Sequence, residues 1–531
     1  MKEPVKSSAW HRSPIGRSVR WMFSWRGLRR ILIVAGWMVT LLAVLYAEEN
    51  WRGRRAWNRY RQELEARGEQ LDFKAFIPKA IPEEKNFAAT PFFDHVFASK
   101  TNRHNWDDAI ARAGSRVSGP KLKGSRAGRR AVDLAAWEMV LSEVRAGDSN
   151  RHDRIESGKF DLLARSNAAP AVLEALRASE PVFVELRAAG RRIGSRYPVR
   201  YDLEDPWGIL LPHLVAIKSV AQRLQLKACA ELALNRSPDG LQDVRLILRL
   251  ADSLKEESFL ISHLLRLACF QIAVQPIWEG LSDHRWSDAQ LLELQAQLQQ
   301  YDFLGDASHA LDGERAGGIW TVDLLHQRKY TLNSLLDDSE LGSHPIRAGF
   351  ARFLGRIAPR GWFYLEQVNY CRLFELQLGG TFDLATRRVF PGQTKSNAQE
   401  MERTIAGDRV GKSYKAVLNH QVFAALLLPA LDKTIRKAAT AQTTADEAVI
   451  ACALERFRMS EGRLPGTLEA LVPRFLERLP HDMISGNGYH YAPRDGGHFV
   501  LYSVGWDEKD DGGVTGRVLF DDTGDWVWEY P

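Results

Sequence analysis

The longest uninterrupted apolar run in the chain spans Ile31–Ala47 and carries no charged residue. Arg29 and Arg30 precede this run, and Glu48 and Glu49 follow it. A helix needs about 17 to 25 apolar residues to cross a hydrocarbon core roughly 30 Å thick, and this run meets the lower limit. The pattern therefore predicts one transmembrane helix over residues 31–47, preceded by a basic tail over residues 1–30.

The same run also has features of a cleaved signal peptide, so the two alternatives must be compared. Its apolar core is longer than the 7 to 15 residues typical of a signal, and Leu45-Tyr46-Ala47 offers a small residue only at the last position of a cleavage site. Aromatic residues flank both ends of the run, as they do at membrane interfaces. They are Trp21, Trp25, Tyr46, Trp51 and Trp57. We therefore expect a retained anchor that contacts lipid through residues 21–60.

The orientation of the anchor depends on the basic residues on its two sides. Lys and Arg are equally frequent in the 20 residues before and after the run, but Lys2 and Lys6 add to the N-terminal side. Because basic flanks stay in the cytoplasm, we expect a cytoplasmic N-terminus, with the bulk of the chain outside a bacterial inner membrane.

After the run, the polar and aromatic pattern from Trp51 predicts a juxtamembrane helix that reaches about Arg67. Three prolines, Pro78, Pro82 and Pro91, then favour an extended spacer, because proline disfavours helix. Residues 100–130 are rich in Arg, Lys, Gly and Ser and are interpreted as a solvated linker. A basic loop that grips phosphate or lipid is the alternative. Together these features give a juxtamembrane helix and linker over residues 48–130.

Residues 131–440 are dominated by apolar positions at helical spacing, and the fold class predicted for the chain is mainly α. The predicted helices are 132–144, 169–189, 207–234, 241–254, 259–281 and 288–298. Polar turns separate several of them, which indicates a bundle or an irregular α-solenoid. Residues 305–412 contain many Gly and Pro residues and allow only weak helix assignments.

The segment Phe259–Val274 is apolar enough to raise the question of a second membrane span. Arg266 lies in its middle and would cost about 2.5 to 3.5 kcal/mol in a bilayer, and His263 adds to that cost. We therefore predict a buried core helix there.

The net positive charge of the chain is concentrated around the predicted membrane anchor. The net charge of the 531 residues is +6, but residues 1–67 contain 14 Lys and Arg against 5 Asp and Glu, which leaves −3 for the remainder. The basic residues thus flank the anchor, where they meet anionic lipid. No nucleic-acid partner is expected.

The sequence contains no complete copy of the enzyme motifs that we considered. Residues 406–413 nearly match the phosphate-binding P-loop, but Ala406 stands where the first glycine belongs and the preceding segment is polar, so no nucleotide is expected. The sequence has no HExxH and no GxSxG, and His213 and His263 fit core histidines. Four dispersed cysteines, Cys229, Cys269, Cys371 and Cys452, fit small buried residues. No catalytic residue is nominated.

Residues 441–531 have a different pattern and are predicted to form a small α+β domain. An amphipathic helix over 444–460 is followed by a short helix at 468–472, and strands are expected at 489–491 and 498–502. The expected shape is a helix followed by an antiparallel sheet.

An ordered series of motifs within residues 445–513 resembles the globular head of the major pseudopilins of type II secretion. These motifs are Ala453–Phe457, Glu461–Pro465, Leu468–Pro473, Leu479–Asp482, Tyr489–Tyr491 and Phe499–Gly505, with Asp507 after them. The rest of the chain departs from that family, because the anchor lies about 400 residues upstream of the head and lacks the cleavage site and the glutamate of a pilin. We therefore expect no pilin-like processing or polymerisation.

The resemblance implies a calcium ion bound by the loop Gly505–Gly513, with Asp507, Asp510 and Asp511 as candidate ligands. Residues 500–531 hold eight acids against Lys509 and Arg517, and carboxylates on a glycine-containing loop suit a hard cation. An acidic solvated turn without an ion is the alternative.

These features give two hypotheses for function. The first is a single-pass envelope protein with a binding or assembly role, possible calcium binding and envelope protein partners linked to a secretion or pilus-like system. The second is a membrane-anchored extracytoplasmic hydrolase with its site in the helical body. A cavity where acids and histidines converge would favour the second hypothesis, and an exposed apolar groove would favour the first.

Overall fold

The computed structural model describes the chain in segments. These are residues 24–98, 109–114, 117–118, 129–146, 155–156, 162–201, 208–327, 329, 358–405, 419–421, 423–424, 428, 431–494, 498–517 and 522–529. Helices dominate these segments, as the sequence predicts, and the few strands are short.

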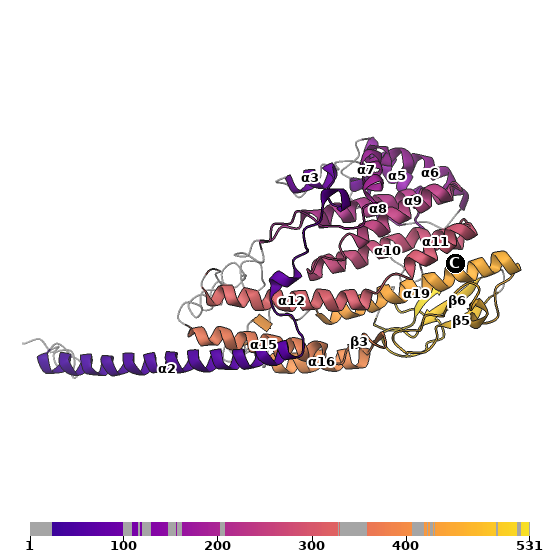
Figure 1. Ribbon diagram of the computed structural model, residues 1–531. Coiled ribbons are helices and arrows are strands. Elements are labelled where there is room, and N and C mark those ends of the chain that lie inside the picture. Colours follow the sequence, from indigo (N-terminus) through magenta and orange to yellow (C-terminus); the bar gives the residue numbers. More distant parts are fainter. Residues whose placement is uncertain are drawn as a thin grey trace, which may run out of the picture.

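The apolar run lies within α2 (Trp25–Ala66), a single uninterrupted helix of 42 residues whose first turn is capped by the Ser24 side chain. The most apolar part of α2 is entirely exposed, and it extends away from the body as a free rod (Figure 1). The C-terminal part of α2 buries Trp57, Tyr60 and Leu64 against α15 (Arg360–Leu378). One helix thus joins the candidate membrane span to the folded body.

The two helices approach most closely at a pair of glycines. A Cβ atom on Gly53 would overlap the carbonyl oxygen of Gly361, and a Cβ atom on Gly361 would overlap the carbonyl oxygen of Glu49. Asn50 Oδ1 accepts a hydrogen bond of 2.7 Å from the Gly361 amide at the same crossing. Farther along, the Tyr60 hydroxyl donates to Glu375 at 2.6 Å. Glycine is required here because only bare backbone allows this approach.

The body stacks its helices in successive layers above α2 (Figure 1). The packing order runs from α15 to α12 (Phe303–His326), then to α10 (Leu260–Ser282), then to α8 (Pro212–Ala233) and α9 (Ser237–Asp252). Among the described residues, the remaining α-helices are α3 (Pro91–Ala98), α4 (Ala109–Gly114), α5 (Leu134–Arg145), α6 (Leu162–Leu176), α7 (Glu180–Ala189), α11 (Asp288–Leu298), α16 (Pro391–Ile405) and α19 (Leu431–Glu461). The 3-10 segments are η2 (Phe73–Phe76), η3 (Glu83–Lys85), η4 (Arg177–Ser179) and η5 (Leu468–Leu471).

Helix α10 is long and apolar enough to cross a membrane by composition, but more than half of its most apolar window is buried inside the body. Arg266 is 2% exposed and forms ion pairs with Asp306 and, at 3.5 Å, with Asp252. The structure therefore places α10 in the core, as the interrupting arginine predicts.

The segment expected to be an extended spacer packs against the body where it is described. Phe87 and Phe93 are fully buried, and Arg192 and Arg196 donate hydrogen bonds to its carbonyl groups. Its prolines exclude long helices but not burial, because aromatic residues between them supply an apolar surface. The P-loop-like segment 406–413 lies outside the described residues.

The C-terminal region contains a three-stranded antiparallel sheet in the order β5-β6-β7, formed by β5 (His490–Pro493), β6 (Phe499–Ser503) and β7 (Trp526–Glu529). Two further two-stranded pairs are β1 (Val117–Ser118) with β2 (Ile155–Glu156), which is parallel, and β3 (Phe382–Asp383) with β4 (Arg388–Val389), which is antiparallel. The three-stranded sheet packs on α19, which begins at Leu431 rather than near residue 444. Leu501 and Trp528 belong to the same apolar core as the helical body. The sheet is thus an integral part of the body, and Trp278 Nε1 donates to the Glu529 carbonyl at 3.0 Å across this contact.

Candidate functional site

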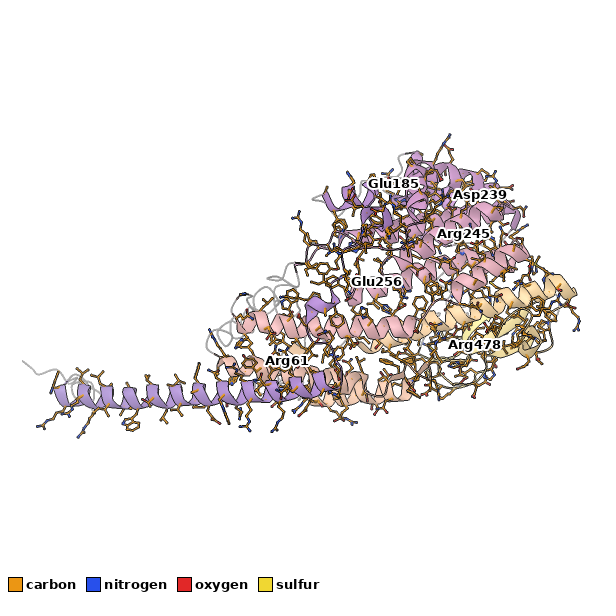
Figure 2. All side chains as sticks on the ribbon, viewed as in Figure 1. Arg61, Glu185, Asp239, Arg245, Glu256 and Arg478 are labelled. Carbon is orange, nitrogen blue, oxygen red and sulfur yellow. The ribbon has the colours of Figure 1, made fainter. Side chains whose placement is uncertain are left out.

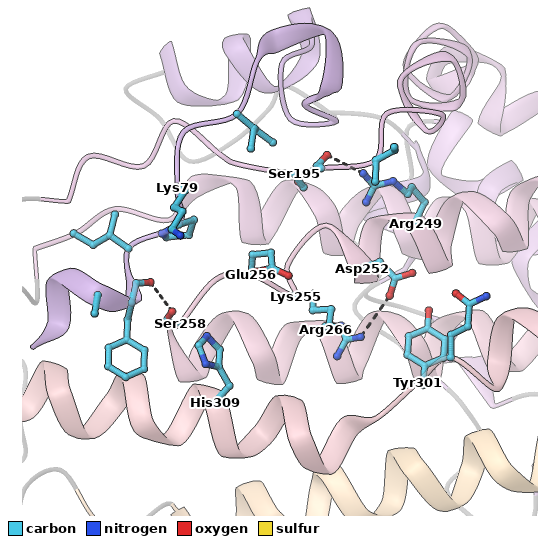
Figure 3. A pocket seen from close by; sticks show the side chains of 18 of the residues that line it. Lys79, Ser195, Arg249, Asp252, Lys255, Glu256, Ser258, Arg266, Tyr301 and His309 are labelled. Atoms are coloured by element: carbon cyan, nitrogen blue, oxygen red, sulfur yellow. Dashed lines mark hydrogen bonds and ion pairs between the residues drawn. The ribbon is translucent and has the colours of Figure 1, made fainter. Parts of the chain in front are cut away.

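A charged cavity of about 850 Å³ opens where the chain leaving α2 crosses the body (Figure 3). Its walls come from residues 75–81, from the loop 193–195, from the end of α9 and the turn after it, from α10 and from α12. Its ionisable lining residues are Lys79, Arg249, Asp252, Lys255, Glu256, Arg266, Tyr301 and His309. A cavity of this size with convergent polar groups is the usual form of a ligand site.

The wall over residues 73–81 is fixed by backbone contacts. Asp72 caps η2 by accepting a hydrogen bond from the Lys74 amide, and the buried Ser258 hydroxyl donates to the Phe76 carbonyl at 2.6 Å. Arg196 Nε donates to the Pro78 carbonyl at 2.9 Å. The segment is therefore held as a strap against α12 and the turn before α10.

Arg249 contributes a positive charge that neutral groups hold in place. Its Nη2 donates to the carbonyl oxygens of Arg192, at 2.8 Å, and Gly194, at 3.0 Å, and its guanidinium lies 4.5 Å from the centre of the Phe87 ring. Burial lowers the pKa of Arg249, and the nearby charge of Asp252 opposes that change. Within the described part of the chain, no carboxylate forms an ion pair with this guanidinium.

Asp252 and Glu256 place two carboxyl groups on the cavity wall (Figure 3). Asp252 is half-buried and pairs with Arg266 at 3.5 Å, whereas Glu256 is exposed. Burial raises the pKa of Asp252, and Arg266 acts in the opposite direction. Tyr301 lies on the same wall, buried, and the Arg266 guanidinium is 5.5 Å from the centre of its ring. The exposed His309 of α12 has its ring centre 5.7 Å from that of Phe76.

A second, apolar pocket of about 470 Å³ lies on the other side of the same strap. Phe73 and Trp320 stack in its wall with their ring centres 4.9 Å apart. The other lining side chains are mostly aliphatic or aromatic and include Ile209, Leu211, Phe259, Leu260, Ile261 and Leu264. Gly313 and Gly317 of α12 add bare backbone, and Glu314 is the single ionisable lining residue.

Ser258 lines both cavities, so they adjoin at the position where its hydroxyl meets the Phe76 carbonyl. Gly313 makes this junction possible, because a Cβ atom there would overlap the Ser258 carbonyl oxygen. A charged compartment and an apolar compartment therefore lie side by side under one strap.

The three aspartates expected to bind calcium do not converge. Asp507 Oδ2 accepts a hydrogen bond from the Gly524 amide at 3.1 Å, while Asp510 Oδ1 accepts from Tyr502 at 3.1 Å and from the Gly512 amide at 2.9 Å. Asp511 is exposed. Among the described residues, no group of three or more His, Cys, Asp or Glu side chains is arranged to hold a metal ion.

The acidic loop is organised instead by Asp525, which the sequence reasoning did not single out. Its carboxylate is 3% exposed and accepts from the amides of Asp511, Gly513 and Val514 at 3.2, 2.7 and 3.3 Å. By accepting from three backbone amides, the Asp525 carboxylate closes this loop.

The histidines and cysteines lie where the sequence predicts. His213 is fully buried and bonds Glu257 at 2.8 Å, and burial lowers the pKa of His263 to about 3. Ser262 donates to the other Glu257 oxygen at 2.5 Å, so the carboxylate lies between the serine and the histidine. Ser262, Glu257 and His213 are all buried, so these hydrogen bonds belong to the interior of the body, where a substrate does not reach the serine. All four cysteines are buried and free.

The cavity residues share no local motif, and only Arg266 gave a signal in the sequence, as a charge inside an apolar helix. Searches against protein-family models, curated proteins and solved structures found no match.

Proposed function

We propose that this chain is a single-pass, membrane-anchored binding protein of a bacterial envelope. One observation supports this proposal best: α2 carries a fully exposed apolar segment that continues without a break into a half that packs on the body. The end of that helix leads within a few residues into the strap that walls both cavities. The anchor and the binding site are therefore parts of one rigid unit.

The proposed orientation places the N-terminus in the cytoplasm and the body outside the inner membrane. A role in assembly with a secretion or pilus-like system rests on the resemblance of residues 445–513 to pseudopilin heads. The helix and antiparallel sheet of that region are compatible with such a head.

The test of anchoring and orientation uses the full chain with a C-terminal tag. We expect the protein to remain in the membrane pellet after carbonate extraction, and the tag to be digested when protease is added to intact spheroplasts. Release by carbonate would refute the anchor. A tag that resists protease until the spheroplasts are lysed would place the body in the cytoplasm and refute the orientation.

A second candidate function is hydrolysis, because two acids and a histidine line the charged cavity. A carboxyl group whose pKa is raised by burial and an exposed carboxyl group in the same cavity are the groups that general acid and base catalysis uses. Asp252→Asn should then abolish turnover in a panel of nitrophenyl esters and glycosides. Asp239→Asn, an exposed change in the first turn of the same helix, should leave it intact. No turnover by the wild-type chain, or equal turnover by the two variants, would remove this candidate.

A further inference from the structure

The two cavities differ in chemistry and share one wall, and this juxtaposition indicates the class of ligand. An apolar compartment of about 470 Å³ and a charged compartment of about 850 Å³ meet at Ser258 beneath the strap. A purely polar metabolite would leave the apolar compartment without a function, and a purely apolar one would leave the charged side chains without a partner. A molecule with an apolar chain and a charged head satisfies both.

The charge of the head follows from the groups that lack a counter-charge. Arg266 is already paired with Asp306 and Asp252, and its partners are fixed. Arg249 is held by two carbonyl groups and an aromatic face, and the exposed Lys79 has no ion pair among the described residues. Arg249 is half-buried and has no ion-pair partner within the described residues, and a ligand anion would relieve the cost of desolvating its charge. Glu256 lies at the rim and does not neutralise Arg249 within the described contacts.

The position of the anchor indicates where the apolar part of the ligand comes from. Helix α2 fixes the body beside a bilayer, and Ile261 and Leu210 present exposed apolar side chains at and beside the apolar compartment. We propose that the adjoining cavities bind an anionic amphiphile from the membrane, with its acyl chain between α10 and α12 and its carboxylate or phosphate head against Arg249 and Lys79. This inference rests on the proposed function, because it assigns a ligand to that binding site.

Two side chains allow each compartment to be tested separately. Arg249→Gln removes the positive charge that would meet the ligand head group, and Arg245→Gln on the same helix is its control (Figure 2). Arg245 is exposed and pairs with Glu293. Gly317→Leu fills the apolar pocket, because the space beyond a Cβ atom there is limited only by Phe73 at 3.7 Å. Gly317→Ala is its control, because one methyl group fits at ordinary contact distance.

The experiment titrates the full chain in lipid nanodiscs with dansyl-undecanoate, an acyl chain with a carboxylate head, and follows dansyl fluorescence. We expect saturable binding that is displaced by oleate and by lysophosphatidylglycerol. Oleyl alcohol should compete about tenfold less well, because a hydrogen bond to a charged group is lost. Arg249→Gln should lower the affinity for the probe by about the same factor, and Arg245→Gln should leave that affinity unchanged. Gly317→Leu should abolish saturable binding, and Gly317→Ala should retain it.

Several outcomes would overturn the proposal. Equal signals from the wild type and Gly317→Leu would mean that the probe only partitions into the bilayer. Displacement of the probe by inorganic phosphate alone would mean that the site binds phosphate and does not require an acyl chain. If Gly317→Leu does not fold, Ile261→Glu places a negative charge at the exposed edge of the pocket, and unchanged binding by that variant would also overturn the proposal. Carbonate extraction tests the anchor without the probe. A failure of the ligand proposal can therefore be told apart from a failure of the anchoring proposal.

Discussion

The crossing of α2 and α15 gives the sharpest stability prediction, because two physical effects there have opposite signs. Gly53 lies inside a helix, and replacing an interior helical glycine by alanine normally stabilises a protein by about 1 kcal/mol. At this position the added methyl group would overlap the Gly361 carbonyl oxygen, which belongs to backbone and cannot rotate away. The helices must therefore separate.

The magnitude can be worked from the contacts at the crossing. Overpacking of this kind costs about 1 to 3 kcal/mol, and separation also weakens the Asn50–Gly361 hydrogen bond, worth about 1 kcal/mol. After the gain in helix propensity is subtracted, we expect Gly53→Ala to destabilise the protein by about 1 to 3 kcal/mol.

The assay is thermal unfolding of the full chain in nanodiscs, followed by circular dichroism. The matched control is Gly36→Ala in the same helix, where a Cβ atom would meet nothing within 4 Å. The control should melt at or above the wild-type temperature, and Gly53→Ala should melt below it. A Gly53→Ala protein as stable as the control would show that α2 does not pack on α15 as described, and that the anchor is not rigidly joined to the body.

Three further predictions concern the C-terminal region. Burial raises the pKa of Asp446 from 3.8 to about 7, so the folded state holds a proton that the unfolded state releases, and stability should fall as pH rises from about 4 to 7. When the free energy of unfolding is measured by chemical denaturation across this pH range, Asp446→Asn should show a smaller fall than the wild type. An equal fall in both proteins would contradict the raised pKa of Asp446. Asp525→Ala leaves backbone amides without their acceptor and should cost about 1 to 3 kcal/mol, measured by melting temperature, whereas the same change at the exposed Asp511 should cost little. Calorimetric titration of the full chain with calcium tests the ligands that the resemblance implies: it predicts binding heat that is lost in Asp507→Asn, and no heat from the wild type would refute it.

Much of the helical architecture could be predicted because its signals are local. The helix 288–298 has the bounds that the sequence predicts, and the structure shows a capping box of Ser287 and Gln290 at its start. The long α2 follows from a charge-free run and the polar helix after it. These patterns need no knowledge of distant contacts.

The weakly assigned helix α12 was obscured by its own glycines. Gly313 and Gly318 lower helix propensity, yet the fold requires them where the Ser258 backbone and the Tyr370 ring approach. The start of α19 was missed for a related reason, because buried polar residues such as Thr434 and Gln442 interrupt the apolar stripe. In both helices, tertiary packing overrides the local signal.

The candidate site could not be predicted, because it is assembled from segments far apart in the sequence. Lys79 follows the anchor, Arg249 ends a body helix, and Trp320 lies in a third element. Prolines in the strap indicated a spacer but could not show that it packs against α12 and the turn before α10. Arg266 alone signalled a polar environment inside an apolar helix.

The continuity of α2 sets a mechanical property of the whole assembly. At 1.5 Å per residue its 42 residues form a rod of about 63 Å, and the helix is unbroken between its apolar end and the end that packs against α15. A domain on a flexible tether sweeps a hemisphere above a bilayer, whereas a body joined to its membrane span by such a rod would keep one height and one tilt. Encounters with other membrane components would then be governed by lateral diffusion and by rotation about the membrane normal.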